Sequence, residues 1–320
     1  MKNALLTLLL TTVVSIRGAG FTEVEITSTL DGKPQKALWW HPEDATETAM
    51  PLLVMLHTWS GNYQQKNWKE AGLVECERRG WALIHPDFRG PNRRPQACGS
   101  DLAVQDILDA VTWVRGQIRI DPRRIYLVGT SGGGHMSLLM AGRAPELWAG
   151  VSAWVPISDV AAWHRQTTEA GRKNYAGNCE KACGGKPGDS PAVDAQYRRR
   201  SPLTYLHRVK GLPLDINAGI HDGYTGSVPV SQSLHAFNTA AIANGQDKSA
   251  LSTAQIHWFR TQRTVPEGLI GEREDEAGRI RPILFRRTAG PARITIFDGG
   301  HEGDMPTAFR WLEKQLKAER

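Results

Sequence analysis

The sequence predicts an α/β fold: a mainly parallel central sheet flanked by helices, with lid-like insertions. Short apolar runs typical of buried strands alternate with stretches of helical periodicity between residues 52 and 317. The chain has 320 residues and is 40% hydrophobic, which is enough to bury one large core without cross-links. Parallel strands need right-handed crossovers, and functional residues then gather at the carboxyl ends of the strands.

The first half of the chain shows the alternation clearly. β-rich runs at 22–28 and 37–41 precede a continuous apolar run at 52–56, which is typical of a strand buried on both faces. A helical stretch at 65–79 ends at Gly80 and leads to a second apolar run at 81–84. Apolar residues then recur at helical spacing from Val104 to Ile118, so one face of this segment should pack on the sheet.

The second half continues the pattern with two interruptions. Strands are expected at 124–128, 150–155, 214–217 and 294–297, and helices after residue 131, at 230–244 and at 306–317. The stretch 160–205 is rich in Gly, Asn, Lys and Arg, with little periodicity, and predicts an irregular excursion over the end of the sheet. The stretch 245–292 is interpreted as a hairpin-like insertion that extends the sheet or covers the site.

The first twenty residues have the pattern of a signal peptide. Lys2 is followed by an apolar core from Ala4 to Ile16 and then by the small residues 18–20. That core is shorter than the roughly 20 residues of a membrane-spanning helix. We therefore expect residues 1–20 to be removed, residues 21–320 to form a single domain, and the mature protein to be secreted or periplasmic, without a membrane segment. An uncleaved anchor at residues 1–20 is the alternative.

Composition excludes several other classes of function. The net charge of +6 is mild and no long basic run occurs, which argues against nucleic acid as a partner. The four cysteines lack metal-site spacing with a histidine, so neither a metal nor a cofactor is expected. If the cysteines form disulfides, a local bridge between Cys179 and Cys183 would leave Cys76 to pair with Cys98.

Ser131 is the leading candidate for a catalytic residue. It stands in the segment Gly129-Thr130-Ser131-Gly132-Gly133, between a predicted strand and a predicted helix. A serine on such a sharp turn needs small neighbours, because side chains there would collide with adjacent backbone. The turn also directs the N–H of Gly132 to the place where an oxyanion would form. This segment therefore predicts a nucleophile and one oxyanion donor.

A nucleophilic serine needs a base and an orienting acid. His301 is the expected base, because it follows the last predicted strand within Gly299-Gly300-His301-Glu302-Gly303. Asp222, which follows the strand at 214–217, is the first candidate for the acid, with Asp159 as the alternative. Asp298 is interpreted mainly as a turn residue. The predicted triad is Ser131, Asp222 and His301, in that chain order.

The second oxyanion donor should come from the loop after residues 52–56. We expect the N–H of Trp59 there, with that of Thr58 as the alternative. Among the aromatic residues, Trp163 and Trp258 lie in segments that could reach the substrate, and His221 could line the pocket. The other conspicuous residues have structural interpretations as buried or packed side chains: His57, His135, Trp113, Trp148 and Trp311.

From about residue 50 to 320 the chain resembles α/β-hydrolases of the prolyl-oligopeptidase-like group, close to their stand-alone esterases. The resemblance rests on Gly129–His135, on Ser201–Tyr205, on Gly219-x-x-Asp222 before Val228-Pro229, and on Gly299–Glu302. Thr58 replaces the usual small residue of the oxyanion loop, and the segment 223–227 is longer than is common. The resemblance implies a serine hydrolase with the triad named above.

The family's peptidases carry an N-terminal propeller, and residues 21–51 are too few for one. We therefore expect a secreted serine carboxylesterase that acts on acetyl or feruloyl esters of polysaccharides. A serine peptidase of the same group is the enzymatic alternative. A non-catalytic binding protein with a hydrolase fold is the alternative of a different class.

Overall fold

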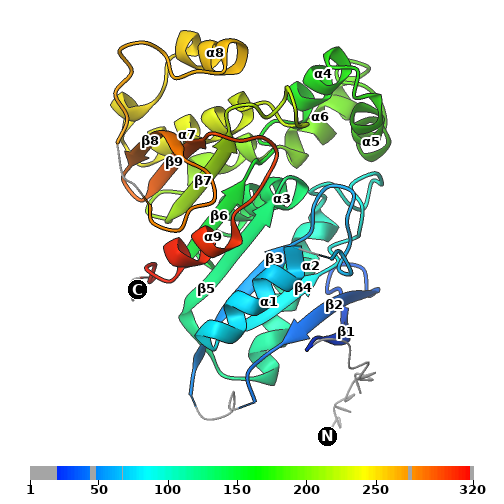
Figure 1. Cartoon of the computed structure of the whole chain (residues 1–320). Coiled ribbons are helices and arrows are strands. Elements are labelled where there is room, and N and C mark those ends of the chain that lie inside the picture. The colour runs from blue at the N-terminus through cyan, green and yellow to red at the C-terminus, as the bar shows by residue number, and fades with distance from the viewer. Residues whose placement is uncertain (1–19, 44–47, 67, 273–275, 318–320) are drawn as a thin grey trace, which may run out of the picture.

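The computed structural model describes residues 20–43, 48–66, 68–272 and 276–317. Its centre is a nine-stranded sheet with the order β1-β2-β4-β3-β5-β6-β7-β9-β8 (Figure 1). Six neighbouring strands are parallel to one another: β4, β3, β5, β6, β7 and β9. At the two edges of the sheet the pairing is antiparallel, through β1 and β2 on one side and β8 on the other. The signal peptide predicted for residues 1–20 lies, except for Gly20, outside the described residues.

Strands and helices alternate as an α/β fold requires. The strands are β1 Thr22–Thr27, β2 Pro34–Trp40, β3 Met50–Leu56, β4 Ala82–Pro86, β5 Ile120–Thr130, β6 Gly150–Trp154, β7 Leu214–Gly219, β8 Ile283–Ala289 and β9 Ala292–Phe297. The α-helices are α1 Trp68–Arg79, α2 Asp101–Gln117, α3 Gly132–Arg143, α4 Val160–Glu169, α5 Lys173–Cys183, α6 Pro191–Arg200, α7 Ser231–Ala243, α8 Thr253–Gln262 and α9 Met305–Leu312.

Helices cover both faces of the sheet, which explains why its central strands are apolar throughout. Every residue of β3 is buried. One core cluster joins the sheet to α2, α3 and α7, and a second joins it to α1 and α9, which lie together on the near side in Figure 1. Trp148 and Trp311 are buried in these cores and Trp113 packs against their edge, so their structural interpretation is confirmed.

The predicted sheet and its flanking helices are confirmed, but the interpretation of 160–205 as irregular is wrong. This stretch forms α4, α5 and α6, followed by two short 3₁₀ turns. Asp159 and Ser190 cap α4 and α6 by accepting hydrogen bonds from backbone N–H groups of the first turn. Gly184 ends α5 in the left-handed region. These capping residues mark the ends of the helices, and a search for apolar periodicity does not detect them.

The stretch 245–292 combines the expected hairpin with a helix. β8 pairs antiparallel with β9 and extends the sheet at its edge, as a hairpin-like insertion should. The apolar run 256–259, in contrast, belongs to α8. Ser252 and Gln255 start this helix with a reciprocal capping box, in which each side chain accepts a bond from the other's backbone N–H.

The four cysteines are free thiols in the structure. Cys76 is buried on α1, in the core cluster between that helix and the sheet. Cys98, Cys179 and Cys183 belong to another cluster, which also contains Trp59. Both suggested bridges, Cys179 with Cys183 and Cys76 with Cys98, are therefore wrong.

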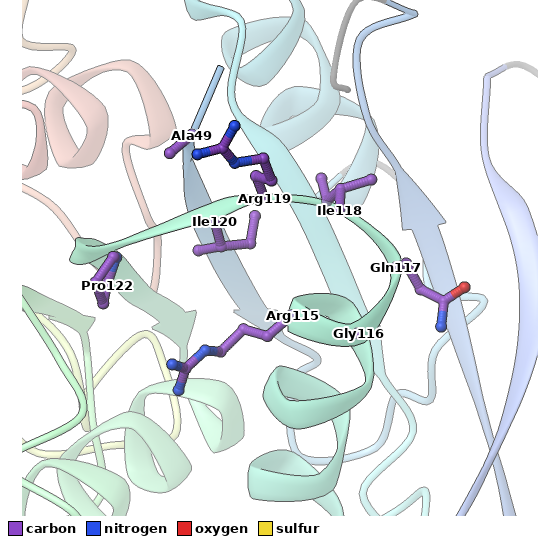
Figure 2. Close-up of a pocket in the computed structure, with 8 residues that line it drawn as sticks. All are labelled: Ala49, Arg115, Gly116, Gln117, Ile118, Arg119, Ile120 and Pro122. Atoms are coloured by element: carbon purple, nitrogen blue, oxygen red, sulfur yellow. The ribbon is translucent and has the colours of Figure 1, made fainter. Parts of the chain in front are cut away.

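A hollow of about 630 Å³ lies at the end of the sheet remote from Ser131 (Figure 2). Its lining runs from Arg115 on α2 to Ile120, the first residue of β5, whereas Ser131 follows the last residue of that strand. Arg115 and Arg119 are exposed there.

Among the described residues, no helix is both long and apolar enough to cross a membrane.

Candidate active site

Ser131 stands on a sharp turn between β5 and α3. Its φ of 60° and ψ of −118° are unusual for a residue with a side chain. Two backbone hydrogen bonds hold it there: its N–H donates to the Trp154 carbonyl over 2.8 Å, and its own carbonyl accepts from His135 N–H over 2.8 Å. Such strained geometry persists only where the surroundings fix it, and it is common at functional sites.

The glycines around Ser131 are required by close backbone approaches. A Cβ atom on Gly129 would lie 2.3 Å from the Gly133 carbonyl carbon, and one on Gly133 would lie 2.4 Å from the Leu56 oxygen. A Cβ atom on Gly132 would lie 2.3 Å from the Trp59 nitrogen. The turn can therefore form only with glycine at these positions.

The structure brings the three predicted triad residues together. The distance from His301 Nε2 to Ser131 Oγ is 2.8 Å, and from His301 Nδ1 to Asp222 Oδ2 it is 2.7 Å. The other carboxylate oxygen, Oδ1, accepts the backbone N–H groups of Gly223 and Val228 over 2.8 and 3.0 Å. Because an ionised Asp222 can only accept, Nδ1 carries the proton, and Nε2 is free to accept the serine proton.

The two rival aspartates are engaged elsewhere. Asp159 caps α4 through a hydrogen bond of 2.9 Å from Ala162 N–H to its Oδ1. Asp298 pairs with His221, whose Nε2 lies 3.4 Å from the Asp298 Oδ1. Neither carboxylate hydrogen-bonds to His301 in the described part of the chain. Asp222 therefore fits the acid position, and the sequence-based preference for it agrees with the geometry.

The loop after β3 offers one free donor to an oxyanion. Thr58 N–H donates to the Gln65 side-chain oxygen over 2.8 Å, so it is occupied. Trp59 N–H has no hydrogen-bond partner among the described residues, and it faces Gly132 at close range. The Trp59 carbonyl accepts from Asn92 N–H over 2.9 Å, which fixes the loop. The N–H groups of Trp59 and Gly132 thus fit an oxyanion hole. No local pattern in the sequence indicates that the Gln65 side chain occupies the Thr58 N–H.

The other residues expected to contact substrate have different surroundings. Trp163 is fully buried, donates to the Ser227 carbonyl over 2.8 Å, and packs edge-on against Trp59 with a ring-centroid separation of 4.6 Å. Trp163 therefore packs against Trp59, the residue that offers the second oxyanion donor. Trp258 is 44% exposed on α8. His221 is partly exposed and paired with Asp298, as described above. None of the three directly contacts Ser131 through a hydrogen bond.

Sequence reasoning missed Trp68, the first residue of α1. A Cβ atom on Gly303 would lie 2.9 Å from the Trp68 ring and 2.5 Å from Thr130 Oγ1. Trp68 is therefore packed next to the strand end that precedes Ser131. In the sequence, Trp68 looks like any other aromatic residue at the start of an amphipathic helix. Only the folded structure shows that it lies beside the site.

Three histidines near this end of the sheet are buried. The two ring nitrogens of His57 lie 2.9 and 2.8 Å from the carbonyl oxygens of Thr58 and Asp87, and a neutral ring donates to one of them. These contacts with neighbouring backbone agree with its structural interpretation. His135 is fully buried beneath the elbow and bonds the Arg200 carbonyl over 2.7 Å. Burial lowers the pKa of His135 to about 4, and burial lowers the pKa of His85 to about 3.

Acid should therefore destabilise the protein before its carboxylates are protonated. Between pH 7 and pH 5 the unfolded chain protonates His135, whereas the folded protein keeps it neutral, so stability falls as the pH falls. We expect a loss of about 2 kcal/mol from this residue over that interval. Urea unfolding at the two pH values measures the loss. His135→Gln should be less stable at pH 7 but show a smaller pH dependence, and an unchanged dependence would contradict the assignment.

Comparison with known proteins identifies the family of this chain. The family model "Prolyl oligopeptidase family" matches residues 78–269, more than half of the chain. The chain belongs to the prolyl oligopeptidase family. Its α/β-hydrolase fold is the one that the resemblance implied.

Solved structures share the fold at low sequence identity. Pyrococcus horikoshii acylaminoacyl peptidase is 20% identical with a TM-score of 0.56, over 71% of this chain and 36% of the peptidase. An acylaminoacyl peptidase in complex with Z-Gly-Gly-Phe-chloromethyl ketone is 19% identical with a TM-score of 0.62, over 94% and 42%. Acetyl xylan esterase from Paenibacillus sp. R4 is 17% identical with a TM-score of 0.62, over 96% and 88%. The chain spans less than half of these peptidases.

Proposed function

We propose that this protein is a secreted serine carboxylesterase that removes acetyl or feruloyl groups from polysaccharides through an acyl-enzyme. The observation that carries the proposal is the hydrogen-bonded relay from Asp222 through His301 to Ser131, with the Trp59 nitrogen close to Gly132 beside the serine. A serine activated in this way, with donors for a developing oxyanion, has the parts that acyl transfer requires.

The mechanism follows from these positions. His301 Nε2 accepts the Ser131 proton as Oγ attacks the ester carbonyl, and the N–H groups of Gly132 and Trp59 donate to the resulting oxyanion. His301 then protonates the departing alcohol, which leaves the acyl group on Ser131. Water, deprotonated by His301, attacks the acyl carbon. The bond from Ser131 Oγ to that carbon then breaks, His301 returns its proton to Oγ, and the acid leaves. Asp222 remains ionised throughout and stabilises the charged imidazole.

An end-to-end structural likeness supports the ester over the peptide bond. The acetyl xylan esterase aligns with 96% of this chain and with 88% of its own length, whereas the acylaminoacyl peptidases extend far beyond the aligned part. Peptide hydrolysis is the second candidate, favoured by the family to which the chain belongs. Export is proposed from the pattern of residues 1–20 alone.

A fluorophosphonate probe tests the nucleophile. We expect the wild-type protein to be labelled stoichiometrically, because the probe traps a serine that a histidine activates. Ser131→Ala should not be labelled, and Ser137→Ala, which changes a buried serine on α3, is the matched control. Labelling of Ser131→Ala would remove the nucleophile assignment. A folded wild-type protein that resists the probe would favour the binding-protein alternative.

Chromogenic substrates separate the two enzymatic candidates. We expect a higher kcat/KM for p-nitrophenyl acetate than for aminoacyl and prolyl p-nitroanilides, after correction for the intrinsic reactivity of each substrate. Release of acetate or ferulate from a panel of polysaccharides then identifies the acyl group. Faster cleavage of the anilides would reverse the order of the two candidates.

A further inference from the structure

A large aromatic side chain, Tyr224, is exposed beside the candidate active site. It lies two residues after Asp222, and 70% of its surface is exposed. Its turn packs on the catalytic histidine, because a Cβ atom on Gly226 would lie 2.4 Å from the His301 Cβ atom. The N–H groups of Tyr224 and Thr225 donate to the His221 carbonyl and fix the turn. Tyr224 is therefore held at the rim of the site.

Two arginines flank Tyr224. The Arg263 guanidinium lies over the tyrosine ring, with its Cζ atom 4.1 Å from the ring centroid. Arg172 Nη2 donates to the Tyr224 carbonyl over 3.0 Å, while its buried Nε has no hydrogen-bond partner. In the described part of the chain, neither guanidinium forms an ion pair with a carboxylate. Both retain N–H donors that an anionic group could use.

These side chains come from segments far apart in the sequence. Arg172 lies between α4 and α5, and Arg263 directly follows α8, where it caps the helix with a left-handed φ of 55°. An ion pair of 3.4 Å from Arg260 on α8 to Glu169 on α4 joins the two insertions. Figure 1 shows both helices at the same end of the molecule. The rim is thus assembled from both insertions and the loop that carries Asp222.

We infer that Tyr224, Arg172 and Arg263 form a subsite for a sugar residue that carries a carboxylate, and that the ester substrate is an acylated polysaccharide containing uronic acid. This inference rests on the proposed esterase function. Arg263 covers one face of the tyrosine ring, and the exposed remainder of the ring offers an apolar surface to the C–H face of a sugar. The planar guanidinium groups match a carboxylate, with which arginine forms paired hydrogen bonds. A neutral sugar would use the ring and leave both cations unpaired.

Binding tests the inference without any turnover. Isothermal titration calorimetry of the full-length Ser131→Ala protein compares a glucuronic acid-bearing xylo-oligosaccharide with a neutral xylo-oligosaccharide of the same length. We expect the acidic ligand to bind about tenfold more tightly, and this preference to shrink at high salt. Arg263→Gln and Arg172→Gln should each reduce it. Arg115→Gln, at the remote end of the sheet (Figure 2), is the matched control and should leave it unchanged.

Acetate release provides the second measurement. We expect wild type to act on acetylated glucuronoxylan fragments with a higher kcat/KM than on acetylated fragments without uronic acid. Tyr224→Ala should lower kcat/KM for the carbohydrate esters about tenfold, mainly through KM, and by less for p-nitrophenyl acetate. Tyr224→Phe keeps the ring and should lose less than Tyr224→Ala on the carbohydrate esters, and an equal loss in the two variants would contradict a role for the ring face.

The outcomes separate this inference from the proposed function. Equal binding of acidic and neutral ligands, or a preference that survives both arginine substitutions, would overturn the subsite even if the protein hydrolyses esters. A binding preference in a protein that fails to hydrolyse p-nitrophenyl acetate would support the subsite and count against the esterase.

Discussion

His301→Ala is expected to lower kcat for ester hydrolysis on the order of 10⁵- to 10⁶-fold while the fold is retained. The expected loss is this large because His301 is the hydrogen-bond partner of Ser131 Oγ, at 2.8 Å, and no second histidine bonds that oxygen in the described chain. Without the base, the serine must lose its proton to water. Stopped and continuous assays with p-nitrophenyl acetate measure the loss, and circular dichroism checks the fold.

His207→Ala is the matched control for this prediction. His207 is an exposed histidine in the 3₁₀ turn Leu206–Arg208, away from the relay, and its removal should change kcat less than twofold. Added imidazole should restore part of the activity of His301→Ala, because a free base can occupy the vacated position beside Ser131. A His301→Ala protein within tenfold of wild type would show that another group deprotonates the serine.

Much of the site could be predicted from the sequence because its residues lie in short, recognisable sequence patterns. The glycines at 129, 132 and 133 are each required by a backbone contact closer than 2.5 Å, so the elbow leaves a compulsory pattern. Asp222 and His301 follow predicted strands, and parallel strands bring their carboxyl ends together. The order of serine, acid and histidine along the chain admits Asp159 as well, so the preference for Asp222 depended on its place directly after the strand at 214–217.

The parts that escaped prediction depend on contacts between distant segments. Thr58 and Trp59 are adjacent, and only the hydrogen bond from Thr58 to Gln65 decides which N–H remains free. The helix α4 buries residues at helical spacing, but two of them, His164 and Thr167, are polar, so a search for apolar periodicity does not find them. The contact of Tyr224 with Arg263 joins the loop that carries Asp222 to the second insertion. Such pairings are set by tertiary packing, which leaves little trace in local composition.

Asp222→Asn is expected to lower kcat/KM about 10⁴-fold with little change in structure. The orientation of the new amide is fixed by the structure. Oδ1 of Asp222 accepts two backbone N–H groups, from Gly223 and Val228, so the amide oxygen of asparagine should take that position. Its NH₂ group must then face His301 Nδ1, which becomes an acceptor. The proton moves to Nε2, where it blocks acceptance of the Ser131 proton.

Asp159→Asn provides the discriminating comparison for the acid. Asparagine caps helices about as well as aspartate, so the bond from Ala162 N–H should survive and kcat/KM should remain within a few-fold of wild type. NMR of the histidine ring protons can report the tautomer directly, with the Nδ1 proton signal present in wild type and absent from Asp222→Asn. If instead Asp159→Asn were the inactive variant, the acid would lie after β6 rather than β7, and the relay seen here would not be the catalytic one.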